Sequence, residues 1–500
     1  MNRWLITFAV MSATIMQLLD TTIVNVALPH MQGSLSAAPD QISWVLTSYL
    51  VSSAIFMPLT GYLTDKLGRK NYLLICIGGF VLASALCGAA TSLFEIVLFR
   101  LLQGAFGAGL VPLSQAILTD TFPKEEQGKA MAIWGMGIML GPILGPTLGG
   151  YLLDIADWRW LFYINIPLGI LSFLLAWYVV PDTAKKERGM DWIGLILIST
   201  AIGATQYFLD RGNRVDWFDA REIQVAVFLA VGGMIGFLLY QLRAKENIVF
   251  NLAIFKDRNF TLCSILLGIM VLGMYGTMVI QPLMMENLLN YSTLTTGLVM
   301  APRGISSMFG MLLVGWLIKY VDPRHLVITG VIFAVAGTAV GMYYNTQMSM
   351  EWIVWSLLLQ GFGIGLVFVP LSVVAFSTLP EQLRTEGTGL YSLLRTMGGS
   401  IGISISITLF TRYSQQAWNQ LGGFIQPFSP APAAYLRPLH LDPHSPLGSA
   451  VLGHTLNNQA QMVALDNVFA FITWTFILML PLVFLLRRGS SAKPAAELQA

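Results

Sequence analysis

One acidic and one basic side chain stand inside long apolar stretches, and both are suited to moving protons. Asp20 lies in the stretch LDTTIVNVALP, and Arg100 lies in FRLLQG. A carboxylate in an apolar environment is costly to ionise, so it can take up and release a proton. A guanidinium keeps its charge and can reposition a nearby carboxylate. We therefore expect Asp20 to carry protons and Arg100 to tune the proton site. The alternative is a structural Asp20 bonded to a neighbouring hydroxyl.

Several other polar residues in the apolar stretches are candidates for contact with a bound compound. Glu286 could meet a cationic compound or simply face water, and Arg395 could face a central cavity or brace helix packing. At 100° per residue the others lie near the helix faces of Asp20 or Arg100. The full set is Gln17, Thr21, Asn25, Gln103, Gln115, Glu286 and Arg395.

The elements that hold these side chains are predicted to be membrane helices. Hydrophobic residues make up 55% of the 500 residues, charged residues only 11%, and the mean hydropathy is +0.67. Soluble domains carry roughly 25% charged residues. This composition excludes a soluble enzyme, a secreted disulfide scaffold and a disordered chain. The net charge of +2, without a basic domain, gives no reason to expect a nucleic-acid partner.

Fourteen segments are long and apolar enough to cross a bilayer as helices. Lysines and arginines gather in alternate loops, which by the positive-inside rule places both termini in the cytoplasm. The first segment lacks a signal-peptide cleavage site and is interpreted as a span. The predicted spans cover residues 5–28, 43–63, 71–91, 95–118, 129–153, 160–180, 191–210, 222–242, 260–284, 297–319, 325–345, 351–376, 386–410 and 466–486.

The chain contains an internal repeat. The string LQGAFGAGLVPLS, from Leu102 to Ser114, matches LQGFGIGLVFVPLS, from Leu359 to Ser372. The sequence therefore predicts an all-α polytopic membrane protein with two related six-helix halves and two inserted helices. The expected division is 1–184 for the first half, 185–256 for the insertion, and 257–500 for the second half, including a Pro-rich extracytoplasmic loop at 411–465.

The string GYLTDKLGRK, from Gly61 to Lys70, resembles the signature loop of the major facilitator superfamily. Six-helix parallel repeats are also the layout of that fold. Gly61 permits close helix contact and Gly68 makes the turn. The resemblance implies a gate latch, the alternative being basic residues that serve topology only. The predicted gate residues are Gly61, Asp65, Gly68, Arg69, Lys70 and Asp120, with Asp120 as a candidate partner of Arg69.

A glycine-proline pattern in the fifth span resembles the antiporter signature of drug exporters in this superfamily. Glycines recur every four residues on one face, which lets helices approach closely. The resemblance implies an interface sealed against proton leak; the alternative is a packing face alone. The residues of this pattern are Gly137, Gly141, Pro142, Gly145, Gly149 and Gly150.

Together these strings, with DWRWLFYINIPLG from Asp157 to Gly169, resemble the fourteen-span drug:proton antiporters of the EmrB/QacA type, and the EmrB branch in particular. Arg100 resembles the buried arginine of proton-coupled members. The resemblance implies proton-coupled efflux of hydrophobic toxic compounds across a bacterial inner membrane by alternating access. It also implies a periplasmic membrane-fusion adaptor of the EmrA type and an outer-membrane channel, with the loop at 411–465 as a possible docking point.

Two other classes of function stay open at this point. One is a proton-coupled symporter or an exporter of a specific metabolite, which the glycine-proline pattern disfavours. The other is a non-transporting receptor or scaffold, which the buried Asp20 and Arg100 disfavour. No nucleotide-binding loop, HExxH or CxxC string is present, so we expect no cofactor, no metal site and no enzymatic activity. Cys76, Cys87 and Cys263 lie in apolar segments and are interpreted as core residues.

Overall fold

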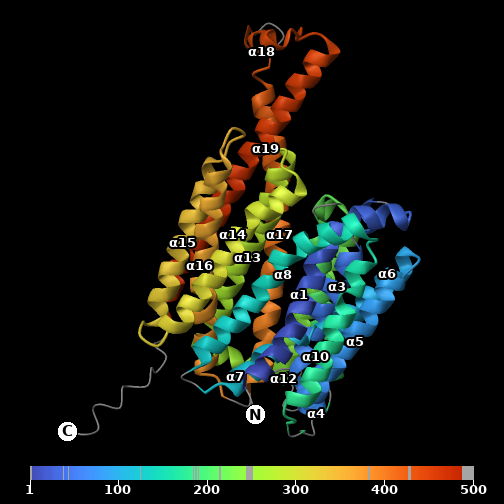
Figure 1. Ribbon diagram of the computed structural model, residues 1–500, viewed down its shortest axis with the longest axis vertical. Helices are drawn as coiled ribbons and strands as arrows, with labels where there is room; N and C mark the ends of the chain where they lie inside the picture. Colours follow the sequence, from blue (N-terminus) through green and yellow to red (C-terminus); the bar gives the residue numbers. More distant parts are fainter. Residues whose placement is uncertain are drawn as a thin grey trace, which may run out of the picture.

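The computed structural model shows a bundle of long helices (Figure 1). Fourteen helical segments of the described chain are long and apolar enough to cross a membrane, which confirms the number predicted. The protein is therefore a multi-pass membrane protein. The structure describes residues 3–37, 39–42, 44–123, 126–183, 185, 189, 191–212, 215–243, 252–380, 383–425 and 430–486.

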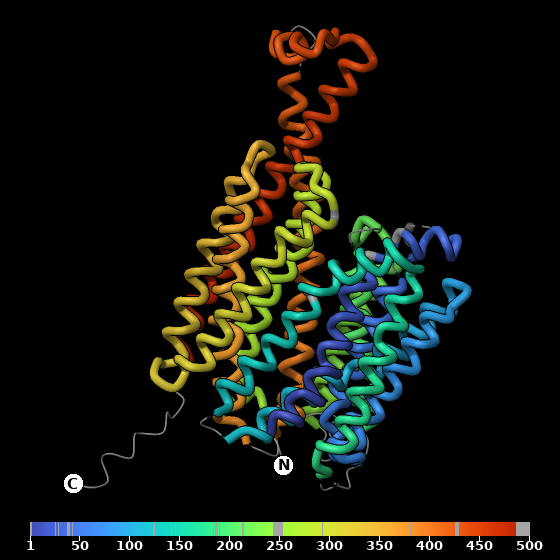
Figure 2. The backbone as a smooth tube through the Cα atoms, viewed as in Figure 1, coloured from blue at the N-terminus to red at the C-terminus, as the bar shows by residue number. Residues whose placement is uncertain are grey.

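The first six spans form one group of helices, on the right in Figure 2, coloured from blue to teal. Short breaks divide three of these spans into consecutive helices. The elements are α1 (Arg3–Ser34), α2 (Pro39–Ile42), α3 (Trp44–Phe56) with η1 (Met57–Leu59) and α4 (Thr60–Leu67), α5 (Arg69–Ala89), α6 (Leu93–Gly107) with α7 (Leu110–Thr121), α8 (Gln127–Ile155), and α9 (Trp160–Tyr163) with α10 (Asn165–Val179).

The last six spans form the second group, on the left in Figure 2 from yellow to red. The two helices between the groups are α11 (Trp192–Arg211) and α12 (Arg221–Arg243). The second group consists of α13 (Arg258–Asn287), α14 (Thr293–Leu317), α15 (Pro323–Val340), α16 (Met350–Ser377), α17 (Arg384–Gly422), and α19 (Pro446–Ile477) with α20 (Met479–Phe484). The end of the bundle at which α1 begins is called the terminal face. The opposite end, beyond which α17 and α19 continue, is called the stalk face.

Helix α11 contacts both groups, whereas α12 is mostly exposed. Gln206 of α11 donates a hydrogen bond from Nε2 to Oγ of Ser400 on α17, at 2.8 Å. Thr47 of α3 donates from its hydroxyl to the carboxylate of Asp210 on α11. Most of the large apolar side chains on α12 face outward, as expected for a helix that contacts lipid, whereas Ile223 and Phe237 are buried.

The described part of residues 411–465, which we call the stalk, is formed mainly by helices, whereas the sequence predicted a Pro-rich loop there. Helix α17 has 39 residues, about 58 Å, and therefore runs well beyond a hydrocarbon core of roughly 30 Å. Beyond the core it packs on α19, and the short α18 (Pro430–Leu436) covers their ends (Figure 1). Buried Ala417, Leu456 and Ala460 supply the small contact surface that keeps α17 and α19 paired. The prolines of this segment suggested a loop, but they cluster at its tip.

Helices α1 and α8 approach closely where the glycine-proline pattern lies. A Cβ atom added to Gly141 would stand 2.6 Å from Cβ and 2.7 Å from the carbonyl carbon of Leu18 on α1. Thr22 of α1 donates a hydrogen bond from its hydroxyl to the carbonyl of Gly141, at 2.9 Å. Gly137 and Gly145 face α1 in the same way, whereas a Cβ atom at Gly150 would meet nothing within 4 Å. The pattern is thus a packing surface inside the first half.

We predict that Gly141→Val destabilises the protein and that Gly150→Val does not. The added side chain at position 141 must push α1 away, and overpacking of this kind costs about 1–3 kcal/mol. Thermal unfolding in lipid nanodiscs, followed by tryptophan fluorescence, measures the difference. Equal unfolding midpoints for the two variants would show that the close approach is not required for stability.

Candidate functional site

The carboxylate of Asp20 lies at the centre of a polar cluster inside the first half. Asp20 is fully buried on α1, and its Oδ2 atom is 2.6 Å from Nη1 of Arg100 on α6. Its Oδ1 atom accepts hydrogen bonds from Nε2 of Gln103 at 2.9 Å and from Nδ2 of Asn165 at 2.7 Å. A buried ion pair is tolerated only when its remaining hydrogen bonds are also satisfied. The cluster meets that condition with donors from α6 and α10.

The guanidinium of Arg100 is held from several directions. Its Nε donates to the carbonyl of Val45 on α3 at 3.0 Å, and Nη1 also donates to Oε1 of Gln103 at 2.7 Å. The ring of Tyr49 lies 4.4 Å from the guanidinium carbon, within the range of a cation–π contact. Arg100 therefore ties α3 and α6 to α1 through Asp20. A change in the charge of Asp20 must be felt by all three helices.

Sequence reasoning identified Asp20, Arg100 and Gln103 but missed Asn165. Asn165 is fully buried at the start of α10, and its Nδ2 also lies 2.9 Å from Oγ of Ser84 on α5. The signal was an asparagine in the otherwise apolar string FYINIPLG, because a buried amide needs partners. Tyr49 was missed as well, since an aromatic residue in a span gives no signal of its own.

Four other candidates on α1 and α7 are not bonded to the Asp20 carboxylate. Gln17 is buried on α1, one turn before Asp20. The Thr21 hydroxyl donates to its own helix at Leu18, and Asn25 is exposed. Gln115 lies on α7, where its Nε2 is 3.9 Å from the sulfur of Met131 on α8. Of these four, only Gln17 is placed to extend the cluster along α1.

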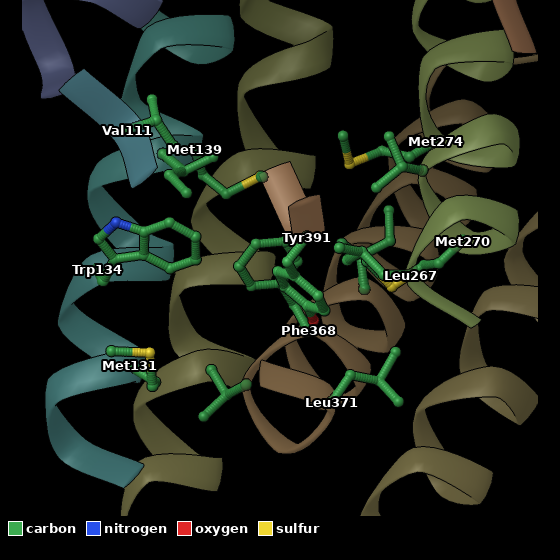
Figure 3. Packing of buried hydrophobic residues seen from close by; sticks show 14 of the residues in the cluster. Val111, Met131, Trp134, Met139, Leu267, Met270, Met274, Phe368, Leu371 and Tyr391 are labelled. Carbon is green, nitrogen blue, oxygen red and sulfur yellow. The ribbon is translucent and has the colours of Figure 1, made fainter. Parts of the chain in front are cut away.

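Large apolar side chains from both halves meet where α8 packs against the second half (Figure 3). Trp134 of α8 stacks on Phe368 of α16 with ring centroids 5.8 Å apart. Arg395 of α17 lies 5.8 Å from the ring of Trp134 on the opposite half, whereas Glu286 lies near the stalk-face end of α13 and is partly exposed. The contact region between the halves is thus aromatic and methionine-rich. Among the described residues, no group of potential ligands could hold a metal ion.

At the terminal face, charged side chains join the two halves. Arg69, which begins α5, forms an ion pair with Asp120 near the end of α7. Asp120 also accepts from Nη1 of Arg384 on α17 at 3.3 Å, and Nη2 of Arg69 donates to the hydroxyl of Thr385 at 3.1 Å. Sequence reasoning paired Arg69 with Asp120 but did not include Arg384. These four residues form what we call the latch.

The glycines of the GYLTDKLGRK string allow the latch to close. A Cβ atom at Gly61 would lie 2.7 Å from Cγ of Glu386 on α17, so only glycine leaves room for the second half. Gly68 has φ of +84°, a conformation that favours glycine. Asp65 lies on α4 and Lys70 is partly buried on α5. In this conformation the halves are therefore in contact at the terminal face.

The two helical halves meet across an apolar contact region, and one of them contains a buried charge pair. This arrangement is that of a membrane transporter built from two halves. The family model of the Major Facilitator Superfamily matches residues 10–403. Solved structures agree on the fold. The human organic anion transporter MFSD10 superimposes with a TM-score of 0.62 at 15% identity, covering 95% of this chain and 100% of that chain. The proton:xylose symporter XylE gives 0.57 at 14% identity, covering 94% of each chain.

Curated relatives are similar over nearly the full length. Multidrug export protein EmrB of Escherichia coli is 32% identical over 96% of this chain and 94% of its own. Fatty acid resistance protein FarB of Neisseria gonorrhoeae is 34% identical over 96% and 95%, respectively. The chain belongs to the Major Facilitator Superfamily and, within it, to the fourteen-span family of the EmrB type. The resemblance noted in the sequence is thereby confirmed.

We predict that Asp120→Asn opens the terminal face. The substitution weakens the ion pair between Asp120 and Arg384, which joins the two halves, and a partly exposed pair contributes up to about 1 kcal/mol. The closed state should therefore lose roughly fivefold in population. Spin labels on Lys66→Cys and Lys319→Cys, which are exposed on opposite halves, would report longer distances by pulsed electron resonance.

The matched control for this measurement is Asp157→Asn. Asp157 also forms an ion pair with an arginine, Arg159, at 2.7 Å, but it does so outside the latch. We expect its distance distribution to match that of the unsubstituted protein. An unchanged distribution for Asp120→Asn would mean that the latch does not hold the halves together.

Proposed function

We propose that the protein exports hydrophobic toxic compounds in exchange for protons. The observation that carries the proposal is the fully buried Asp20–Arg100 pair, because an ionisable side chain inside a membrane span is costly and marks a functional site. The names of two relatives, multidrug export protein EmrB of Escherichia coli and colistin resistance protein EmrB of Acinetobacter baumannii, support export of toxic compounds. These names favour export over uptake of a metabolite.

The cluster suggests how protonation could drive the return step. Protonation neutralises the Asp20 carboxylate and converts one acceptor oxygen into a hydroxyl. Arg100 then loses its counter-ion while keeping its contacts to Val45 and Gln103. An unpaired buried guanidinium is strongly unfavourable. A rearrangement of α1 against α6 that admits water to Arg100 relieves this cost, and α1 also carries the packing contact with α8.

We propose a location in the bacterial inner membrane, with the terminal face in the cytoplasm. The abundance of lysine and arginine in the loops of that face supports this orientation. The closed latch would then seal the cytoplasmic side. Compounds would enter between the halves when the latch opens, and leave toward the stalk face when it closes. The division into residues 1–184, 185–256 and 257–500 is consistent with two moving halves and an inserted pair.

We predict that Asp20→Asn abolishes proton-coupled transport while the protein stays folded. Asparagine keeps the shape of the side chain but cannot carry a proton. The test uses proteoliposomes that contain the pH dye pyranine and are given a pH gradient and a hydrophobic dye. It follows the movement of protons and of the hydrophobic dye together. We expect opposite fluxes for the unsubstituted protein and neither flux for Asp20→Asn.

The control for this experiment is Asp154→Asn, at an exposed position near the end of α8. It makes the same chemical change away from the cluster and should transport normally. Dye export by Asp20→Asn at the unsubstituted rate would remove Asp20 from the coupling mechanism. Proton and dye fluxes in the same direction would show a symporter.

We further propose that the stalk binds a periplasmic membrane-fusion adaptor of the EmrA type, which leads to an outer-membrane channel. The stalk exposes large apolar side chains that no membrane covers at that height. Phe424 is 78% exposed, and Leu447 is 62% exposed. Such side chains are typical of protein contact surfaces. The paired α17 and α19 give this surface a rigid support.

Shortening the stalk is predicted to separate transport from resistance. Replacement of residues 424–444 by a short Gly-Ser linker removes the tip but leaves all spans in place. Dye transport in proteoliposomes should be unchanged, whereas growth of cells on toxic compounds should fall to the level without the protein. Full resistance with the shortened stalk would contradict adaptor binding at this site.

A further inference from the structure

The Asp20 carboxylate is fully buried, so a proton that it carries reaches the terminal face only through the interior of the first half. Toward that face lie buried polar atoms without partners. Gln17 is one turn of α1 closer to the terminal face, and the hydroxyl of Tyr49 on α3 faces it. Neither Oε1 of Gln17 nor the Tyr49 hydroxyl has a hydrogen-bond partner among the described residues. Gln17 is 5% exposed and Tyr49 is 2% exposed, so both atoms are exceptions to the rule that buried polar groups are paired.

The helix next to Tyr49 is interrupted at this depth. Helix α6 ends at Gly107, and α7 begins at Leu110. A Cβ atom added to Gly107 would lie 2.8 Å from the hydroxyl oxygen of Tyr49, so glycine leaves room for that hydroxyl. Pro112 has no N–H group, and the carbonyl of Ala108 therefore lacks its usual helical donor. The break thus places space and a backbone acceptor beside Tyr49.

A second buried tyrosine hydroxyl contacts the same break from the terminal-face side. Tyr72 lies in the first turn of α5 and is buried. A Cβ atom added to Gly109 would lie 2.9 Å from its hydroxyl oxygen. That hydroxyl also faces Thr60 of α4, whose buried Oγ1 has no hydrogen-bond partner in the described chain. Gly107 and Gly109 are two residues apart, so their Cα atoms are at most about 7.6 Å apart.

This series of hydroxyls ends beside the latch. Arg69 lies one turn before Tyr72 on α5, and it lines a pocket of about 290 Å³ together with Asp120 of α7 and Arg3 at the start of α1. Charged side chains of this kind hold water at the surface of a membrane protein. A proton that reaches Tyr72 is therefore one helical turn from a polar pocket at the terminal face.

The internal repeat shows that the series is absent from the half that lacks Asp20. The GYLTDKLGRK string has its counterpart at 315–324 in the second half. At the positions equivalent to Thr60 and Tyr72 that half has Val314 and Leu326. Helix α16 also continues without interruption where α6 and α7 are separate. A feature required by the helix packing alone would occur in both halves, whereas the hydroxyls and the break occur only beside the proton cluster.

We propose that the hydroxyls of Tyr49, Tyr72 and Thr60, joined by water molecules, form the route by which the proton of Asp20 leaves toward the terminal face. This inference rests on the proposed exchange of compounds for protons and adds the path of the proton. A hydroxyl accepts a proton on its oxygen and donates its own proton onward. The proton that leaves the Asp20 carboxyl therefore displaces one proton along the series, and water at the terminal face takes up the last one. No hydroxyl of the route stays charged.

The route is incomplete while the latch is closed. Among the described residues, no hydrogen bond joins the Tyr49 hydroxyl to Gln17 or to Tyr72. An exchanger needs such an interruption, because a proton site open to both faces at once would let protons leak across the membrane. The break between α6 and α7 is where a small movement of these helices can complete the series, since neither helix has to bend in its middle.

The rate at which Asp20 loses its proton to one face tests the route. The protein is reconstituted in vesicles with the terminal face outward, which is verified by labelling Lys66→Cys, at an exposed position, with an impermeant maleimide. The external pH is raised rapidly, and infrared spectroscopy follows the carbonyl band of the protonated carboxyl, which is assigned by its absence in Asp20→Asn. We expect Tyr72→Phe and Tyr49→Phe to slow the decay of this band about tenfold or more, because each removes a positioned proton-transfer group and keeps the ring.

Two controls separate a proton route from a structural role. In vesicles with the stalk face outward, Tyr72→Phe should lose the Asp20 proton at the rate of the unsubstituted protein. Tyr344 of the second half is also buried, and its hydroxyl has no hydrogen-bond partner in the described chain. Tyr344→Phe therefore makes the same chemical change away from the route and should leave the rates at both faces unchanged. Size-exclusion chromatography identifies any variant that fails to fold.

The outcomes separate the route from the export function. An unchanged decay toward the terminal face in Tyr72→Phe would overturn the route, as would equal slowing toward both faces, which would show a structural effect. Absence of any carboxyl band due to Asp20 would remove the proton carrier, and the proposed exchange and the route would fail together. Slowing toward the terminal face alone, in a protein that moves no dye in proteoliposomes, would leave the route in place and contradict export.

Discussion

The ion pair between Asp20 and Arg100 is the interaction on which the first half depends. It joins α1 to α6 through two fully buried side chains, and Gln103 and Asn165 complete its hydrogen bonds from two helices. Removing one partner from a buried pair costs more than the pair itself contributes, because the other charge is left behind. This arrangement of α1 against α6 is therefore favoured only while Asp20 and Arg100 compensate each other. That sensitivity to one proton is what a coupled transporter requires.

The close packing of α1 and α8 gives this local event a route to the contact between the halves. Helix α1 carries Asp20 and also Thr22, which is bonded to Gly141 of α8. Helix α8 in turn places Trp134 against Phe368 of the second half. A shift of α1 cannot be absorbed at Gly141, where backbone nearly touches backbone. Rigid contacts of this kind transmit small displacements, because packed interfaces change between discrete arrangements.

Much of the fold was predictable from the sequence, and the reasons are physical. A span must be apolar for about 20 residues, so hydropathy alone locates the fourteen segments. Hydropathy does not predict that α17 continues to Gly422, because outside the membrane this helix is stabilised by packing on α19 and not by lipid. The break between α6 and α7 was also missed. The matching string in α16 runs on without interruption, so similar sequences adopt different local geometry.

The site was predictable in part because buried charge is rare in spans. That rule pointed to Asp20 and Arg100, and helix periodicity added Gln103. Periodicity gives the face of one helix but not the neighbour that this face meets, so Gln115 was placed near Arg100 although it contacts Met131. Arg384 reaches the latch from a distant part of the chain. Asn165 reaches the Asp20 cluster in the same way. Contacts of that kind depend on how helices pack, which one sequence does not specify.

The two halves differ in how they treat buried charge, and this asymmetry bears on how transport could be coupled. The first half has a compensated pair, whose charge changes when Asp20 takes up a proton. The second half has Arg303 and Arg395, whose charge is fixed and unpaired among the described residues. Protonation of Asp20 therefore adds positive charge to an interior in which the second half already carries two guanidinium charges.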